Sequence, residues 1–326
     1  YEDPLIGQVL GGQYRIEYEI GHGGFGTVYR AKQLAVDRDV AVKVLELPMG
    51  LRREHHAMLV ARFRREAKAT SALKHPNTVT LIDFGQDETG VLFLVLELLE
   101  GLDLKSLTIG EAPLASSRVA HIATQICGSL SDAHSRGFVH RDLKPANVFI
   151  SNFQGAQDFA KVLDFGITRM LDPGDEGEVT EITMEGMRIG TPRYMPPEQL
   201  RGEPVGPPTD LYALGCIIYE MLTGKKVFEG PGTVQNAIAH ASAQVPRVEM
   251  TSLTSDQTDH WNGVLARLLA KRSQTRVQTA DEVAALLKPL LQENPGPLPD
   301  IATMSIMVED IVENETPVVP PPTPGP

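Results

Sequence analysis

The sequence is poor in cysteine, lacks a long apolar run and carries no excess of positive charge. Its two cysteines, Cys127 and Cys216, stand on separate apolar segments, so buried free thiols are favoured over a disulfide or a metal site. The apolar runs at residues 91–99 and 211–222 are too short to cross a bilayer, and each contains a glutamate. A net charge of -12 argues against binding to nucleic acid or to anionic membranes. We therefore expect no nucleic-acid partner and no membrane span in this chain.

The composition that remains is typical of a globular protein. Apolar residues make up 42% and charged residues 22%, and 326 residues are enough for two domains with a buried core. Residues 1–13 show no clear pattern and are interpreted as a lead-in, whereas residues 14–97 predict five strands and one helix, at 53–73. From residue 102 the pattern turns helical, with helices predicted at 114–136, 210–222, 232–243, 256–269 and 280–291. Residues 292–326 are rich in proline and acidic side chains, which predicts a disordered tail or linker.

A glycine-rich loop lies between two predicted strands, at residues 14–20 and 28–33. Gly21, Gly23 and Gly26 follow the pattern G-x-G-x-x-G-x-V, and glycine lets backbone N–H groups approach phosphate oxygens closely. A dinucleotide-binding fold uses a similar spacing, but a helix follows its glycines, whereas a strand follows here. The loop therefore indicates a phosphate-binding hairpin, with a tight glycine turn that binds nothing as the alternative.

Lys43 stands in the middle of a third predicted strand, at residues 40–45. An ammonium group in an apolar run is costly unless a counter-charge meets it. In the helix predicted next along the chain, Glu66 is bracketed by Phe63 and Ala67, so its side chain is expected to face inward. An ordinary surface carboxylate is the alternative for Glu66.

Residues 139–147 form a polar turn that joins apolar runs and contains Asp142, Lys144 and Asn147. A carboxylate that can take a hydroxyl proton, an ammonium that can face phosphate and an amide oxygen that can reach a metal are the parts that phosphoryl transfer needs. Asp164 follows a predicted hairpin 22 residues after Asp142 and is followed by Phe165 and Gly166. Oxygen ligands from Asn147 and Asp164 make a plausible Mg²⁺ site.

Taken together, these motifs resemble those of eukaryotic-like (Hanks-type) Ser/Thr protein kinases over about residues 14–291, and the run that begins at Met195 looks most like the bacterial members. The resemblance implies an α+β, bilobal protein-kinase fold. The small β-rich N-lobe with one main helix would span 14–97, and the larger α-helical C-lobe 98–291. The implied function is transfer of the ATP γ-phosphoryl group to Ser/Thr hydroxyls of proteins, including the chain's own activation loop, with ATP and Mg²⁺ as cofactors and Mn²⁺ as a substitute. Lys144 implies Ser/Thr rather than Tyr acceptors.

The resemblance also assigns roles to single residues. Asp142 would orient the acceptor hydroxyl and receive its proton, Lys144 would steady the γ-phosphoryl group, and Lys43, paired with Glu66, would hold the phosphates. Asn147 and Asp164 would hold Mg²⁺. The implied nucleotide-binding residues, with Leu96 lining the back of their pocket, are Ile20, Gly21, Gly23, Gly24, Gly26, Val28, Ala41, Lys43, Glu97, Leu99 and Phe149.

Residues 167–189 are acidic and loop-like and resemble an activation segment. Phosphorylation would fall on Thr180 and Thr183, because the added charge could be captured by cationic side chains. The implied receivers are Arg62, Arg141 and Arg169, and Thr191 would shape the acceptor site.

The segment after Thr191 departs from the family pattern, because Pro196 stands where alanine is usual before Pro197 and Glu198. The resemblance implies that Glu198 pairs with Arg276, although Val277 stands where the family has proline. It also implies that Asp210 braces the backbone of the catalytic loop.

Protein substrates are the expected partners, with self-association for phosphorylation in trans as an open option. The expected location is the cytoplasm, either of the chain alone or as the cytosolic part of a larger, membrane-anchored kinase. Two other functions stay open. A pseudokinase scaffold or signalling adaptor is disfavoured by the full catalytic set, and a small-molecule kinase of related fold is disfavoured by the activation-segment ending at residues 191–198.

Overall fold

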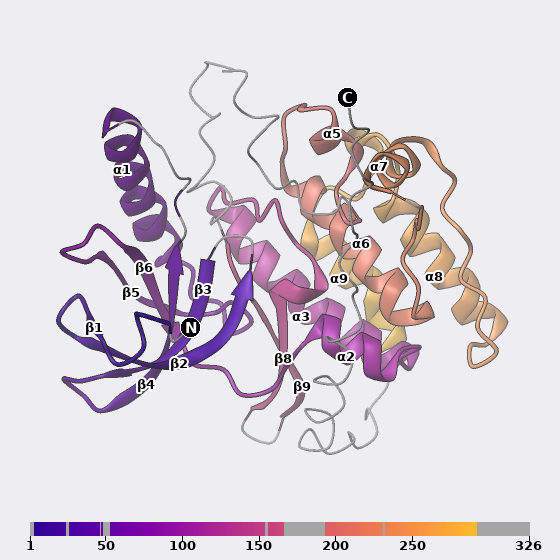
Figure 1. Ribbon diagram of the computed structural model, residues 1–326. Coiled ribbons are helices and arrows are strands. Elements are labelled where there is room, and N and C mark those ends of the chain that lie inside the picture. The colour runs from indigo at the N-terminus through magenta and orange to yellow at the C-terminus, as the bar shows by residue number, and fades with distance from the viewer. Residues whose placement is uncertain are drawn as a thin grey trace, which may run out of the picture.

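The structure is a computed structural model that describes residues 3–23, 26–45, 47, 53–153, 156–165, 193–230 and 232–291. Figure 1 shows a small sheet with one helix beside it, joined to a larger helical part. This arrangement agrees with the predicted α+β bilobal fold. In the part of the chain described, no helix is both long and apolar enough to span a bilayer. The predictions for Gly24, Arg169, Thr180, Thr183, Thr191 and residues 292–326 lie outside the described residues.

The N-lobe is built on an antiparallel sheet with the strand order β1-β2-β3-β4-β6-β5. Its strands are Val9–Leu10 (β1), Tyr14–Gly23 (β2), Gly26–Gln33 (β3), Arg38–Leu45 (β4), Leu81–Gln86 (β5) and Leu92–Glu97 (β6). The sequence predicts only five of these six strands. The sixth is β1, which lies in the supposed lead-in and pairs with β2, and its Leu10 is 1% exposed.

Strand β4 is buried on both faces, which explains why residues 40–45 are apolar apart from Lys43. Val42 and Val44 join a core cluster with Phe93 on one face. On the other face Leu45 packs with Phe63 of helix α1 (Arg53–Thr70), the helix beside the sheet in Figure 1. Side chains alternate along a strand, so Lys43 shares the second face with Leu45.

The C-lobe is organised around helix α6 (Pro207–Thr223), whose residues from Thr209 to Leu222 are all buried. A helix that is apolar on all sides is stable only inside a core, and the other helices surround it. Gly224 ends α6 in the left-handed conformation, at φ 70. The described part of the C-lobe also contains the helices α2 (Leu104–Glu111), α3 (Ser116–Ser135), α5 (Pro197–Leu200), α7 (Thr233–Ser242), α8 (Ser255–Leu268) and α9 (Ala280–Leu287), with single turns η1 (Pro145–Asn147), η3 (Ser273–Thr275) and η4 (Lys288–Leu290).

A second, three-stranded sheet lies where the two lobes meet. It consists of β7 (Leu102–Asp103), β8 (Val148–Phe153) and β9 (Ala156–Val162). The backbone of Val162 bonds to both Asn77 O (2.8 Å) and Val79 N (3.0 Å) in the segment before β5. Strand β9 is thereby fixed to the N-lobe just before it delivers Asp164.

Candidate active site

Lys43 and Asp164 meet between the lobes although 121 residues separate them. Lys43 Nζ lies 2.6 Å from Asp164 Oδ2, and Lys43 is only 6% exposed. Asp164 adopts φ 63, in the left-handed region that non-glycine residues seldom occupy. The counter-charge that a buried ammonium needs is therefore supplied by the residue that follows the end of β9 by two positions.

Glu66 lies on α1 and is 4% exposed, so the expectation of an inward-facing carboxylate agrees with its burial. Arg65 Nε lies 3.3 Å from its Oε1. Among the described residues, the ion-pair partner of Lys43 is Asp164 and not Glu66. The arrangement thus brings Lys43 to the metal-binding candidate instead of to the helix.

Asp142, Lys144 and Asn147 are brought together on the loop that leads into η1. Lys144 Nζ lies 2.7 Å from Asp142 Oδ2, and Asn147 Nδ2 donates to the Asp142 backbone oxygen at 2.7 Å. The Asp142 side chain is 32% exposed, so a substrate hydroxyl can reach its carboxylate. Pro145 at the start of η1 fixes the turn that places Asn147 back against Asp142.

The buried carboxylate of Asp210, at the start of α6, binds the backbone of this loop. It accepts the backbone N–H groups of His140 (2.8 Å) and Arg141 (2.9 Å), and His134 Nε2 lies 2.7 Å from it. Arg141 has φ 68, so the backbone here is strained and needs such support. His134 completes this cluster, and the sequence pattern gave no signal for it.

Two further bonds connect the loop to the strand end that carries Asp164. Leu163 N donates to Asn147 O at 2.8 Å, and His140 Nε2 lies 2.7 Å from Leu163 O. Asp142, Asn147 and Asp164 therefore belong to one hydrogen-bonded unit, and Lys43 contacts it from the N-lobe. The donor set suits Mg²⁺, since an amide oxygen and a carboxylate are hard ligands and this ion keeps several waters. In the described residues, no group of three or more His, Cys, Asp or Glu side chains could hold a metal alone.

The apolar residues expected around a nucleotide share a face of the N-lobe sheet. Val28 is paired with Lys43 across β3 and β4, and Ala41 is paired with Leu96 across β4 and β6. Directly paired side chains project to the same side of a sheet. Val28, Ala41 and Leu96 therefore form an apolar surface beside the Lys43 ammonium.

The glycine loop and the segment after β6 flank this surface. Gly26 has φ 135, and a Cβ atom there would lie 1.9 Å from Val44 O, so only glycine fits. Gly21 and Gly23 have open space around them, and Ile20 is 45% exposed.

Leu99, which follows β6, and Phe149, on β8, are both half-buried. The Glu97 backbone N–H donates to Thr80 O at 3.1 Å, and its carboxylate binds Lys161 at 2.7 Å. Lys161 is 8% exposed and links β9 to this segment. Lys161, like Lys43, is a lysine beside apolar strand residues. That pattern in the sequence could have predicted that Lys161 needs a carboxylate partner.

Glu198 and Arg276 form a bidentate ion pair in the C-lobe. Both guanidinium nitrogens Nη1 and Nη2 lie 2.7 Å from the two carboxylate oxygens, and Thr209 Oγ1 donates to the same carboxylate at 3.1 Å. Burial alone would raise the pKa of Glu198, but the bonds from Arg276 and Thr209 outweigh it and hold that pKa below its usual value. The pair fastens α5 to the segment before α9.

Of the arginines expected to receive phosphate, the structure describes Arg62 and Arg141, which lie on different elements. Arg62 is half-buried on α1 and makes no ion pair within the described residues. Arg141 lies on the catalytic loop, where its carbonyl accepts from Gln199 Nε2 at 2.9 Å.

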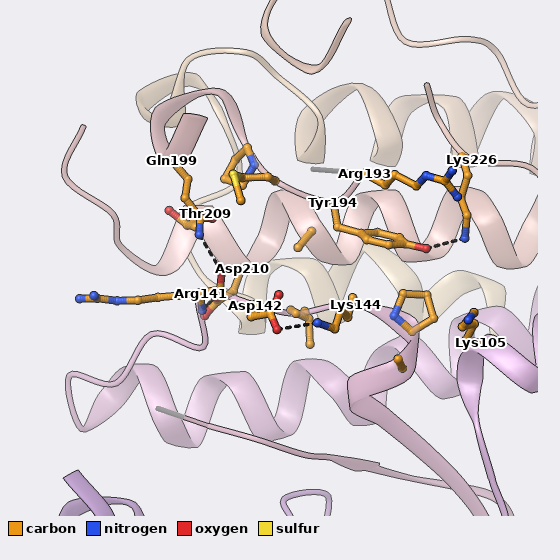
Figure 2. Close-up of a pocket in the computed structure, with 16 residues that line it drawn as sticks. Lys105, Arg141, Asp142, Lys144, Arg193, Tyr194, Gln199, Thr209, Asp210 and Lys226 are labelled. Carbon is orange, nitrogen blue, oxygen red and sulfur yellow. Dashed lines mark hydrogen bonds and ion pairs between the residues drawn. The ribbon is translucent and has the colours of Figure 1, made fainter. Parts of the chain in front are cut away.

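A cavity of about 320 Å³ opens beside Asp142 and Lys144 (Figure 2). Its lining includes charged, aromatic and amide side chains to which the sequence pattern assigned no role. They lie on α2, α5 and the segments beside α5 and α6, and they are Lys105, Arg193, Tyr194, Gln199 and Lys226. They could not be identified from spacing, because they come together only when α2, α5 and α6 pack.

Comparison with known proteins gives one consistent result. The protein kinase domain family matches residues 14–297. Serine/threonine-protein kinase pkn3 of Myxococcus xanthus is 39% identical over 89% of this chain and 52% of its own length. The corresponding values for PknB of Mycolicibacterium smegmatis are 38%, 90% and 45%. The solved kinase domain of PknI from Mycobacterium tuberculosis has a TM-score of 0.64 at 25% identity, over 87% of this chain and 98% of that domain. The chain spans about half the length of the curated relatives that it matches.

Proposed function

This chain belongs to the protein kinase family, and from that premise we propose that it is an active serine/threonine protein kinase of the bacterial type. The proposed reaction transfers the γ-phosphoryl group of ATP to serine or threonine hydroxyls of proteins. The names of the relatives support this acceptor class, and so does Lys144 beside Asp142. The cytoplasm is the proposed location, because ATP is the proposed donor.

Asp142 is the proposed catalytic base. Its exposed carboxylate would orient the acceptor hydroxyl and take its proton, while Lys144, 2.7 Å away, would offset the charge of the transferred group. Asn147 holds the backbone of Asp142 in place through its side-chain amide. Positioning and electrostatics supply most of the catalysis in such a site.

Asn147 and Asp164 are the proposed Mg²⁺ ligands, and the ion would neutralise charge on the ATP phosphates when bound. Lys43 would hold the phosphates from the N-lobe side. The apolar surface of Val28 and Ala41 would take the adenine ring. Gly26 keeps the glycine loop close enough to β4 for its backbone to approach phosphate.

One observation carries this proposal, namely the 2.6 Å contact between Lys43 of the N-lobe and Asp164 of the C-lobe. Because the hydrogen bond from Leu163 N to Asn147 O ties Asp164 to the loop of Asp142, the proposed base and the proposed phosphate-holding lysine belong to one connected group of contacts. Side chains on different surfaces could not act together on one triphosphate.

The test is incubation with Mg·ATP and a set of protein acceptors, followed by phosphosite mapping with mass spectrometry. We expect phosphate on Ser and Thr only, dependence on Mg²⁺, and a loss of at least about 100-fold in Lys43→Met and Asp142→Asn. ATP binding without transfer would favour a pseudokinase scaffold, and transfer to sugars or antibiotics in preference to proteins would favour a small-molecule kinase.

We further propose that Thr180 and Thr183 are sites of phosphorylation in trans. Mixing active chain with the Lys43→Met variant separates the routes, because phosphate on the inactive chain can only come from another copy. The double variant Thr180→Ala, Thr183→Ala should lose the activation that preincubation with Mg·ATP gives. Unchanged activity of that variant would contradict this regulatory role.

A further inference from the structure

The cavity beside Asp142 is strongly cationic in a chain whose net charge is -12. Five cationic side chains border it, against the two carboxylates of Asp142 and Asp210. They are Lys105, Arg141, Lys144, Arg193 and Lys226. Asp142 pairs with Lys144, and the 1% exposed Asp210 is occupied by backbone N–H groups and His134.

The carboxylate of Glu220 could reduce this positive balance, but it is already engaged. It is 5% exposed on α6, and it accepts a hydrogen bond from the Tyr194 hydroxyl at 2.6 Å. Lys226 forms an ion pair with Glu220 and also lies 2.5 Å from that hydroxyl. Burial, with Glu220 adding to it, raises the pKa of Tyr194, so the hydroxyl keeps its proton and continues to donate.

Among the described residues, no ion pair compensates the charges of Arg193 and Lys105, which lie at the same end of the cavity in the view of Figure 2. Arg193 Nε is buried without a hydrogen-bond partner in the described part of the chain. Lys105 is exposed, and the ion pairs of the described residues do not include it. Gathered cations that lack counter-charges are unfavourable unless an anion joins them. A buried unpaired N–H also costs free energy until an acceptor arrives.

We propose that this cavity binds a carboxylate side chain of the acceptor protein, so that the kinase selects Ser or Thr residues with Asp or Glu close by in the sequence. The inference rests on the proposed function and names its substrate class. The position of the cavity suits a side chain near the acceptor residue, because the cavity is lined by Asp142, the proposed base for the acceptor hydroxyl. The chain itself contains such acceptors, since Thr180 and Thr183 stand among Glu178, Glu181 and Glu185.

The experiment compares peptides that differ only in charge. One has the chain's own sequence at 175–187, the second has its glutamates replaced by glutamine, and the third has them replaced by lysine. We expect kcat/KM for the first to exceed that for the second by roughly tenfold at low salt, mostly through KM, and the third to be the poorest substrate. Raising the salt concentration should reduce the difference, because the contact is partly exposed.

The double variant Lys105→Ala, Arg193→Gln tests the assigned residues. Its preference for glutamate over glutamine should fall below about threefold, with turnover of the glutamine peptide unchanged. The matched control is Lys225→Ala, which removes an exposed lysine next to Lys226 that does not border the cavity and should keep the full preference. As a second variant, Lys226→Glu should transfer the preference to the lysine peptide.

Equal kcat/KM for the glutamate and glutamine peptides in the wild type would overturn the inference, and so would a double variant that keeps the preference. Failure of the proposed function itself looks different, because then no peptide and no protein acceptor would be phosphorylated at all.

Discussion

At the scale of single residues, Asp210 is a side chain on which the geometry of the loop at residues 139–147 depends. It accepts two backbone N–H groups, one from the buried His140 and one from Arg141, whose φ is 68. Asp210→Ala would leave both donors without an acceptor. We expect it to lower the free energy of unfolding by about 3 kcal/mol and to reduce kcat more than it raises KM, because the loop loses its alignment.

Urea unfolding and steady-state kinetics measure these two effects. Asp210→Asn is the informative control, since an amide oxygen can still accept one of the bonds and should give an intermediate result. An alanine variant as stable and as active as the wild type would show that other contacts hold the loop.

His240 offers a prediction about pH. It is 0% exposed, and burial, with Lys271 adding to it, lowers its pKa from 6.5 to about 4. Between these values the unfolded chain binds more protons than the folded one, so the free energy of unfolding must fall as pH falls from 6.5 towards 4. The His240 contribution is about 1 kcal/mol per pH unit in that window.

The measurement is the free energy of unfolding at several pH values for wild type and His240→Gln, with the exposed His55→Gln as the control. The first variant should have the shallower slope between pH 6.5 and 4, and the control should follow the wild type. Identical slopes for all three chains would mean that His240 titrates normally in the folded state.

At the residue scale, a motif in the sequence names single residues, whereas the partner of each residue is chosen by packing that the sequence does not show. The apolar run around Lys43 shows that a counter-charge is needed, but it cannot say whether Asp164 or Glu66 supplies it. The structure places Asp164 there. His134 and Lys226 gave no signal, because each acts through a contact with α6 that only the folded chain creates.

At the scale of elements, the close approach of α6 and α8 depends on a glycine. A Cβ atom at Gly215 would lie 2.9 Å from Leu268 Cβ and 3.0 Å from Leu269 Cδ2, inside normal contact distance. Gly215→Ala should therefore lower the free energy of unfolding by about 1–3 kcal/mol, because the two helices must separate.

Gly263 on α8 is the matched control, since nothing lies within 4 Å of the Cβ position there. Gly263→Ala should raise stability by about 0.5–1 kcal/mol through the better helix propensity of alanine. Thermal unfolding of both variants is the measurement, and opposite signs are the expected result. Destabilisation of equal size in both would refute the packing argument.

The ion pair of Glu198 and Arg276 gives a second element-scale prediction, because it fastens α5 to the C-terminal helices. Arg276→Met would leave a buried carboxylate unpaired and should cost about 3–5 kcal/mol. Since the folded pKa of Glu198 is lowered, the pair stabilises fully above the unfolded value of 4.5 and loses this effect as pH falls through the folded pKa.

A double-mutant cycle at pH 7 and again at acidic pH measures the coupling between these two side chains. The second change should be Glu198→Gln, which removes the charge and keeps the shape. A coupling energy near zero at pH 7 would show that the pair is replaceable, and a coupling that grows on acidification would contradict the expected loss of stabilisation.

The periodicity of the sequence predicted the long helices and strands, but not the short elements or the exact residues at which elements end. The predicted helix at 114–136 corresponds to α3 at Ser116–Ser135, whereas β1 and α2 were not assigned. Two residues are too few to show an alternating pattern, so β1 is recognisable only from its pairing with β2. Helix α2 is short and is capped by Asp103, whose carboxylate accepts from Ser106 N at 2.8 Å, and its apolar residues read equally well as part of a loop.

At the scale of the whole molecule, the lobes are joined by charge and by backbone bonds. Lys43 of the N-lobe forms an ion pair with Asp164, and Glu97 of the N-lobe forms one with Lys161. The two C-lobe partners lie just before and just after the end of β9. The sequence could predict two lobes from the change of periodicity near residue 102. It could not predict these two ion pairs, because they link segments that are far apart in the chain.

This joining predicts how a nucleotide should affect the stability of the molecule. A ligand held by Lys43 on one lobe and by Asn147 and Asp164 on the other stabilises both lobes together. With a non-hydrolysable ATP analogue and Mg²⁺ at 100 times the dissociation constant, the gain is about 2.7 kcal/mol, which corresponds to roughly 5–10 °C in Tm. Lys43→Met and the omission of Mg²⁺ should each remove most of this shift, whereas Lys225→Ala should keep it. If the analogue raised the Tm of Lys43→Met as far as that of the wild type, the lysine would not hold the phosphates. A full shift without Mg²⁺ would mean that the nucleotide binds independently of the oxygen ligands at the lobe junction.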